Sequence, residues 1–215
     1  MSATKQEIQK LRMQVMEKDF SRLNDRQQEA VFSTEGPLLV LAGAGSGKTT
    51  VLVNRIANIV RYGQAYYSPL VSDKLTQEDL QACKVYALDG ELSDSVRERL
   101  AVSPCPAWRV MAITFTNKAA GELKDRLIQM LGESGGEVWA STFHASCARM
   151  LRRDGDRLGF TSHFTIYDTD DSRRLMKEVL RDLDISEKVL SPKGALAEIS
   201  RAKDQLTSPQ EYEEN

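Results

Sequence analysis

The fold of this 215-residue chain is decided by the stretch Ala42-Gly43-Ala44-Gly45-Ser46-Gly47-Lys48-Thr49-Thr50. The stretch lies between the apolar run at residues 37–41 and a helical pattern that begins at Lys48. Glycines let a backbone curl around an anion, and the N–H groups at a helix N-terminus attract phosphate. The pattern therefore predicts a phosphate-binding loop, with residues 37–41 as a buried parallel strand that leads into it.

Two side chains at the end of this loop have predicted roles. The Lys48 ammonium would bridge the β- and γ-phosphates of a nucleotide, and the Thr49 hydroxyl would coordinate Mg²⁺. The strict pattern begins with Gly where this chain has Ala42, a change that costs little if the backbone there has an ordinary φ. The alternative is a plain glycine-rich turn between a strand and a helix.

Composition limits the classes of protein that fit. The formal net charge is −2 and the pI is near 5.8, so a nucleic-acid contact must come from a local cleft rather than a generally basic surface. Cys83, Cys105 and Cys147 are odd in number and lack metal-ligand spacing, which is typical of reduced structural thiols. No stretch approaches the roughly 18 apolar residues of a membrane span, so we expect a cytoplasmic protein without membrane contact.

Alternating patterns predict an α/β fold. Residues 109–115 and 138–143 are typical of buried strands, and each is followed by a helical pattern, at residues 117–123 and 144–151. Such alternation predicts a parallel sheet with helices on both faces, and right-handed crossovers bring the strand ends to one edge. We therefore expect the threonine-rich strand ends to line the same crevice as the phosphate loop.

Two helices are expected before the loop. Residues 5–19 are amphipathic, and Asn24 with Gln27 forms the pattern of a capping box at the start of a short helix. Gln27 has a second interpretation, because its amide offers a donor and an acceptor that match the N6 and N7 edge of adenine. The residues alone leave both interpretations open.

The segment from about 64 to 106 differs in character from its surroundings. Turn signals flank two short, charged and helix-like pieces at residues 75–82 and 94–100. The length exceeds an ordinary strand-to-helix connection, so we interpret it as a surface insertion. It is either a contact for a partner or DNA, or a solvated loop.

The last third of the chain contains one acidic motif that could be taken for a magnesium-binding site. Asp168 ends the apolar stretch 164–167, as a magnesium ligand could, but Glu does not follow it. Asp168, Asp170 and Asp171 instead precede a periodic apolar pattern, which predicts a helix N-cap and first-turn acids. A further amphipathic helix is expected at residues 195–206.

Four motifs in order resemble one family. The segments Leu23–Val31, Ala42–Thr49, Ile113–Ala120 and Ser141–His144 are similar to those of the UvrD/PcrA/Rep helicases, superfamily 1 enzymes that move 3′ to 5′ along single DNA strands. The resemblance covers about residues 20–62 and 107–210. It implies an α/β, RecA-like P-loop NTPase lobe at residues 1–195, with the insertion at 64–106, and the beginning of an inserted helical subdomain at 196–215.

The resemblance implies an ATP and Mg²⁺ site. Gln27 becomes the adenine-reading residue, Lys48 and Thr49 are the catalytic residues, and Thr49 is the metal ligand. Thr50 stands where relatives commonly have Arg. The full nucleotide-binding set is Gln27, Ala42, Gly43, Ala44, Gly45, Ser46, Gly47, Lys48, Thr49 and Thr50.

The resemblance also implies a binding site for single-stranded DNA and for single/double-strand junctions. Aromatic faces can stack bases, while hydroxyl, amide and ammonium groups contact phosphates. The alternative is that Phe115 is a core residue and that Thr116 or Asn117 merely caps a helix. The implied DNA-binding residues are Thr114, Phe115, Thr116, Asn117, Lys118, Thr142, Phe143 and His144.

In this family a strand ending in Asp-Glu, a second motor lobe and its arginine fingers complete the ATPase. We expect all three beyond residue 215, so the chain is interpreted as an N-terminal fragment, essentially inactive alone, of a helicase for DNA repair or replication restart. Its partner would be the missing C-terminal motor lobe. Alternatives are the helicase part of a recombination helicase-nuclease, a short nucleotide- or DNA-binding module without turnover, and a small-molecule kinase, which explains only the phosphate loop.

Overall fold

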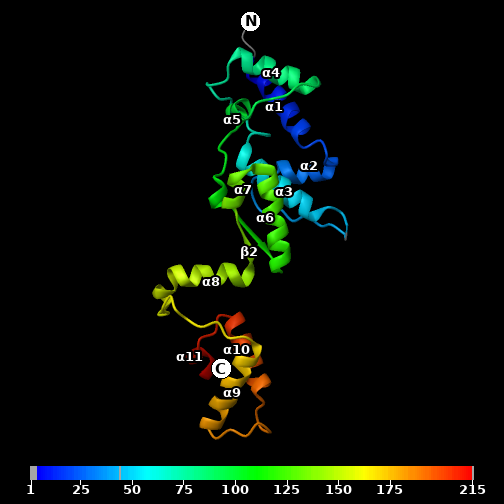
Figure 1. Ribbon diagram of the computed structural model, residues 1–215. Coiled ribbons are helices and arrows are strands. Elements are labelled where there is room, and N and C mark those ends of the chain that lie inside the picture. Colours follow the sequence, from blue (N-terminus) through cyan, green and yellow to red (C-terminus); the bar gives the residue numbers. More distant parts are fainter. Residues whose placement is uncertain (1–3, 44, 215) are drawn as a thin grey trace. The chain divides into compact units, whose positions relative to one another are not determined.

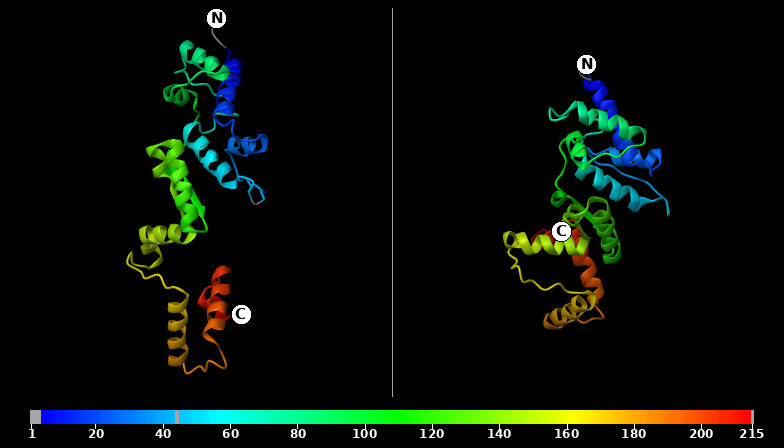
Figure 2. Two further views of the ribbon diagram at one scale, coloured as in Figure 1. Left: turned by 45° about the vertical axis from the view of Figure 1, so that its right-hand side comes forward. Right: turned by 45° about the horizontal axis from the view of Figure 1, so that its top comes forward.

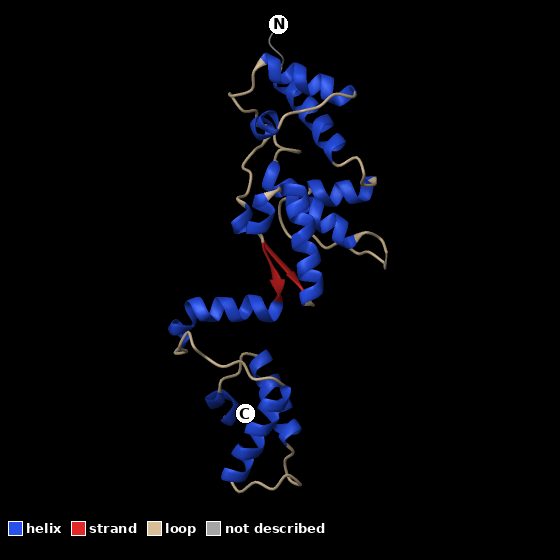
Figure 3. Ribbon diagram, in the orientation of Figure 1, coloured by secondary structure: helices blue, strands red, loops and turns tan. Residues whose placement is uncertain are grey.

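The computed structural model describes residues 4–43 and 45–214. The chain forms two compact units, Met1–Arg149 and Met150–Asn215. Among the described residues helices predominate, and the first unit holds a sheet of two strands (Figure 3). The protein is therefore an α/β protein with a small sheet.

The elements follow one another along the chain as labelled in Figure 1. In the first unit the helices are α1 Lys5–Asp19, α2 Asp25–Phe32, α3 Lys48–Arg61, α4 Gln77–Leu88, α5 Asp94–Leu100, α6 Asn117–Leu131 and α7 Glu133–Glu137, with a 3₁₀ turn at Ala107–Arg109. Helix α8 spans Phe143–Asp154. The second unit continues with a 3₁₀ turn at Gly155–Leu158, α9 Thr169–Asp182, α10 Pro192–Asp204 and α11 Pro209–Glu213.

The sheet consists of β1, Met111–Thr114, and β2, Trp139–Thr142. The two strands are parallel and in register from the Met111–Trp139 pair to the Thr114–Thr142 pair. This confirms the two predicted strands, their parallel pairing and the helices that follow them. Since parallel strands end at the same edge, the segments after Thr114 and Thr142 emerge side by side.

A compact apolar core joins the sheet to its helices. Ala112 of β1 packs with Leu123 and Leu127 of α6 and with Val53 and Ile56 of α3, all of them buried. The sheet and the two helices thus form one packed body. This core fixes α3, the helix that begins at Lys48, relative to the strands.

The predicted strand at residues 37–41 is wrong. Its backbone is irregular, and Leu39 and Leu41 are 81% and 86% exposed. A strand exists only where a neighbour satisfies its backbone N–H and C=O groups, and in the described part of the chain neither β1 nor β2 pairs with this segment. The phosphate loop therefore does not reach the sheet edge through a strand of its own.

The segment 64–106 is not a solvated loop. Its two helix-like pieces are α4, which packs beside α1 (Figure 2), and α5. Val15 and Met16 of α1 are fully buried in a core shared with Leu80 of α4, with Leu100 of α5 and with other side chains of the segment. The segment and the N-terminal helix therefore form one packed subdomain, here called the α1/α4/α5 module.

A buried carboxylate at the end of α1 organises this module. Asp19 accepts hydrogen bonds from the hydroxyls of Tyr62 and Tyr86 and from Arg97 Nε and Nη2, at 2.9 and 3.0 Å. Burial disfavours the charged form, but the bonds from Arg97, Tyr62 and Tyr86 outweigh it and hold the pKa of Asp19 below its ordinary value. Because Tyr62 is the C-cap residue of α3, Asp19 connects the module to the far end of that helix.

The second unit confirms two further predictions. Asp168 is the N-cap of α9, and its side chain accepts from the backbone N–H groups of Asp170 and Asp171, both at 2.8 Å. These bonds account for Asp168 as a capping residue. The amphipathic helix expected at residues 195–206 is α10. The domain boundary near residue 195 stays a prediction.

Arg97→Ala should lower the free energy of unfolding by about 3 kcal/mol, because it leaves the buried Asp19 charge without its cationic partner. The side chains of Asp19 and Arg97 are only 7% and 18% exposed. Urea denaturation measures the loss. Arg26→Ala is the matched control, because the Arg26–Glu29 pair is largely exposed and should contribute less than about 1 kcal/mol. Equal losses in the two variants would contradict the role given to Asp19.

Candidate functional site

The phosphate loop has the backbone that its glycines predict. Gly45 and Gly47 have φ values of +73° and +83°, a left-handed conformation that favours glycine. The φ of Ala42 is not positive, so the backbone accommodates its methyl group without strain. Ala44, one of the predicted nucleotide-binding residues, lies outside the described residues.

The lysine of the loop lies over the loop itself. The Lys48 ammonium donates to the carbonyl oxygens of Gly43, at 2.6 Å, and Ala42, at 3.3 Å. Ser46 also contacts Gly43, through its hydroxyl at 2.8 Å. Lys48, Thr49 and Thr50 are exposed at the first turn of α3, which has Gly47 as its N-cap and no side-chain cap. The first N–H groups of this helix are thus left to other acceptors.

Gln27 is held against the loop as well as against its own helix. The capping box is confirmed, because Gln27 N–H donates to Asn24 Oδ1 at 3.0 Å and Gln27 Oε1 accepts from Asn24 N–H at 3.1 Å. Gln27 Nε2 also donates to the carbonyl oxygen of Ser46 at 3.1 Å. This last bond was not foreseen, since no local pattern connects residues 19 positions apart. The adenine contact stays a prediction.

Helix α3 is tied to α2 by side chains that the motifs do not include. Arg55 donates to the carbonyl oxygen of Ala30 at 2.6 Å, and Asn58 Nδ2 donates to that of Val31 at 3.0 Å. These bonds satisfy carbonyl groups at the C-terminal end of α2, where the helix leaves them unpaired. They fix the positions of Gln27 and Lys48 relative to one another.

An exposed pair of aromatic rings stands at the shared end of the two strands. Phe115 follows β1 and is 91% exposed, and Phe143 follows β2 and is 50% exposed. Their ring centroids are 5.8 Å apart. The interpretation of Phe115 as a core residue is therefore wrong. Two aromatic faces at this distance offer a surface on which a planar ligand can stack.

The polar residues around these rings divide into two groups. The hydroxyls of Thr116 and Thr142 accept from backbone N–H groups of Ala119 and Ala145, at 3.1 and 3.3 Å, so both threonines have structural roles. The capping interpretation is thus confirmed for Thr116, and Thr114 donates to its carbonyl oxygen at 3.1 Å. Other predicted DNA-binding side chains are exposed beside the rings: Asn117, Lys118 and His144.

A hydrogen bond that the motifs did not indicate positions Phe143. The hydroxyls of Ser141, in β2, and Ser146, in α8, lie 2.5 Å apart, and Ser146 is buried whereas Ser141 is half-buried. This bond holds the first turns of α8 against the strand. Ser146 carries no sequence signal of its own, because a serine in a helix is unremarkable.

The structure does not join the phosphate loop to the aromatic pair. In the described ranges, the hydrogen bonds of the loop side chains end on carbonyl oxygens of the loop itself, and the carbonyl oxygen of Ser46 accepts from Gln27. The described residues also contain no group of three or more His, Cys, Asp or Glu side chains that could hold a metal. A Mg²⁺ contact by Thr49 stays a prediction.

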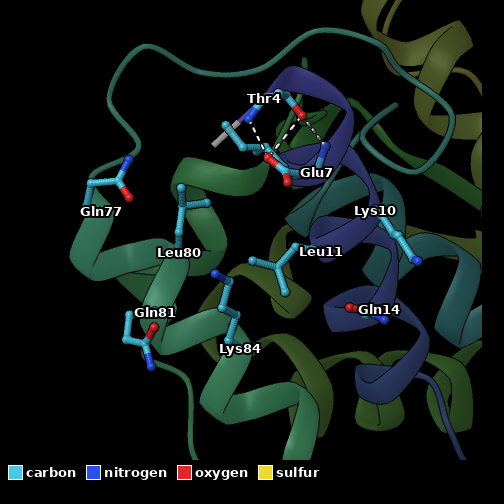
Figure 4. Close-up of a pocket in the computed structure, with 10 residues that line it drawn as sticks. Thr4, Glu7, Lys10, Leu11, Gln14, Gln77, Leu80, Gln81 and Lys84 are labelled. Carbon is cyan, nitrogen blue, oxygen red and sulfur yellow. Dashed lines mark hydrogen bonds between the residues drawn. The ribbon is translucent and has the colours of Figure 1, made fainter. Parts of the chain in front are cut away.

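A separate groove of about 610 Å³ lies between α1 and α4 (Figure 4). Leu11 and Leu80 face one another across it, and Lys10, Lys84 and three glutamines line its sides. None of the predicted nucleotide- or DNA-binding residues lies there. The groove belongs to the α1/α4/α5 module and not to the candidate site.

Cys83, Cys105 and Cys147 are free thiols, the first buried and the last exposed. Within the described ranges, every helix is too short or too polar to cross a membrane.

Comparisons with known proteins agree with the motifs. The sequence pattern of the UvrD/REP helicase N-terminal domain matches residues 23–71 and 92–215. The ATP-dependent DNA helicase PcrA of Bacillus subtilis (strain 168) is 38% identical over 192 residues, which are 89% of this chain and 21% of that protein. PcrA of Leuconostoc citreum is 40% identical over 191 residues, 88% of this chain and 20% of that protein. The chain thus spans about a fifth of the length of these relatives.

Proposed function

The chain belongs to the UvrD/REP helicase N-terminal domain family, and from this premise we propose that it is the ATP-binding and single-strand DNA-binding part of an ATP-dependent 3′–5′ DNA helicase. The relatives named above are ATP-dependent DNA helicases. The whole protein would serve DNA repair or replication restart. Residues 1–195 would form its first RecA-like lobe, and residues 196–215 would begin a helical subdomain.

The exposed aromatic pair is the observation that carries this proposal. Phosphate loops occur in kinases, GTPases and motors alike, so the loop alone selects none of them. The function of a small-molecule kinase does not explain why Phe115 and Phe143 are exposed side by side at the shared end of the two strands. Stacking on aromatic faces is the usual way in which proteins hold single-stranded nucleic acid.

The residues of the loop fit ATP with Mg²⁺. A Cβ added at Gly43 or Gly45 would meet no atom within 4 Å, so the space beside these residues is open to a ligand. Thr49 supplies a hydroxyl oxygen, the hard ligand that Mg²⁺ prefers, and Lys48 supplies a cation. Bound ATP would supply the phosphoryl group whose transfer drives the motor.

On phosphate binding the Lys48 ammonium would exchange the carbonyl oxygens of Gly43 and Ala42 for phosphate oxygens. This exchange is favourable because a charge-assisted bond to phosphate is stronger than a bond to a neutral carbonyl. Thr49 would remain at the first turn of α3 and would hold the metal through its hydroxyl oxygen. The glycine backbone would keep the phosphates close to the helix N-terminus.

We propose further that the 215-residue chain hydrolyses almost no ATP by itself. Phosphoryl transfer needs the metal, the attacking water and a cationic clamp together, and an arginine finger alone contributes about 10³- to 10⁵-fold. The chain contains no Asp-Glu sequence, and Asp168 is occupied as a helix cap. The second motor lobe of the whole protein would supply the groups that complete the ATPase.

Lys48→Ala should weaken binding of Mg²⁺-ATP by at least about tenfold, because a charge-assisted contact to phosphate is lost. Isothermal titration of the 215-residue chain measures the affinity. Lys10→Ala, on α1, removes an exposed lysine away from the loop and should leave the affinity unchanged. Equal affinity of Lys48→Ala and the unmodified chain would contradict the ATP site, and DNA-stimulated turnover by the chain would contradict its inactivity.

Phe115→Ala should weaken binding of an oligothymidylate by about fivefold or more, since loss of one stacked base costs about 1–3 kcal/mol. Fluorescence anisotropy at moderate salt measures the affinity. Tyr212→Ala is the control, because Tyr212 is also exposed but lies in α11. A loss of similar size in both variants would show a nonspecific contact and would count against the proposed DNA site.

A further inference from the structure

Both amide atoms of Gln27 are already used in the structure. Its Oε1 accepts from Asn24 N–H, which closes the capping box of α2, and its Nε2 donates to the carbonyl oxygen of Ser46. That carbonyl belongs to the peptide that leads into Gly47, the N-cap of α3. The amide also packs closely on the turn, because a Cβ added at Gly47 would lie 3.0 Å from Gln27 Nε2.

We propose that Gln27 is a positioning residue for the phosphate loop and that reading a nucleotide base releases it. The bond to Ser46 fixes the peptide between Ser46 and Gly47, and with it the direction of the N–H groups that follow. The inference deepens the proposed function, because it concerns the same ATP site. It assigns Gln27 a contact in addition to that with the base.

Base reading is coupled to release of the bond to Ser46 because the oxygen and nitrogen of one planar amide turn together. Reading the N6 and N7 edge of adenine takes one donor and one acceptor from the side chain. Gln27 Nε2 already donates one N–H to the carbonyl oxygen of Ser46, and Oε1 already accepts one bond from Asn24 N–H. Turning the amide plane toward a base breaks the geometry of both bonds. A bare triphosphate makes no such demand, so it leaves the bond between Gln27 and Ser46 in place.

The chain itself offers variants that separate this role from helix capping. The capping box needs only an acceptor at residue 27, so Gln27→Glu keeps the cap and removes the donor to Ser46. Gln27→Met removes both functions without adding charge. Gln28→Met is the matched control, because Gln28 Nε2 donates to the carbonyl oxygen of Phe20, also at 3.1 Å, and not to the loop.

Hydrogen exchange of the ligand-free 215-residue chain tests the positioning role. Loss of a neutral hydrogen bond changes an equilibrium by about twofold to tenfold. Gln27→Glu and Gln27→Met should therefore speed exchange by that factor at the amides of Ser46 and Val51, which donate to the loop carbonyl oxygens of Gly43 and Gly47. Gln28→Met should leave these amides unchanged. Gln27→Glu keeps the capping acceptor, so the amides of α2 should keep their protection from exchange. If Gln27 only capped α2, this variant would leave exchange in the loop unchanged. Unchanged loop exchange in both Gln27 variants would overturn the proposal.

Nuclear magnetic resonance of the side-chain amides tests the coupling. The Gln27 NH₂ signal, assigned from its absence in Gln27→Glu, should shift with Mg²⁺-ATP and stay in place with Mg²⁺-tripolyphosphate. Equal shifts with both ligands, or none with either bound, would overturn the coupling. If the unmodified chain binds neither ligand, the proposed ATP site fails, whereas hydrogen exchange still decides the role of Gln27 in the loop.

Discussion

The buried carboxylate of Asp19 is the constraint on which the first unit depends. A charge removed from water is stable only when several donors surround it, and Asp19 obtains them from Tyr62, Tyr86 and Arg97. These residues belong to the end of α3, to α4 and to α5, so one carboxylate joins three elements to α1. The far end of α3 is thereby fixed. Its near end carries the phosphate loop, held through Ser46 by Gln27.

Local patterns predicted the parts of the fold that local chemistry determines. The capping box at Asn24, the two strands and the helices after them each follow from neighbouring residues, and the structure has all of them. The strand at residues 37–41 could not be predicted in this way, because pairing depends on a neighbour that the sequence pattern does not specify. Asp19 gave no signal either, since its partners lie 43, 67 and 78 residues away.

The candidate site shows the same division between local and long-range features. The glycines at 45 and 47 and the cap at Thr116 were readable from the sequence, and the exposure of Phe115 was not, because a phenylalanine after a strand is equally at home in a core. The α1/α4/α5 module is a further case. Residues 72–91, which contain all of α4, lie outside the family match, yet Leu80 and Cys83 of that helix are buried against α1. The module is thus an integral part of this unit and supports α3 from the end opposite the loop.

We propose that one unit of this chain carries two separate ligand sites, a nucleotide loop at the start of α3 and a DNA-binding surface at the shared ends of β1 and β2. Hydrogen exchange of the same chain with Mg²⁺-ATP alone and with an oligothymidylate alone tests it most directly. We expect ATP to protect residues 43 and 45–50 and the oligothymidylate to protect residues 114–118 and 142–144. If both ligands protected the same residues, or if neither ligand protected its own set, the proposal of two separate sites would be contradicted.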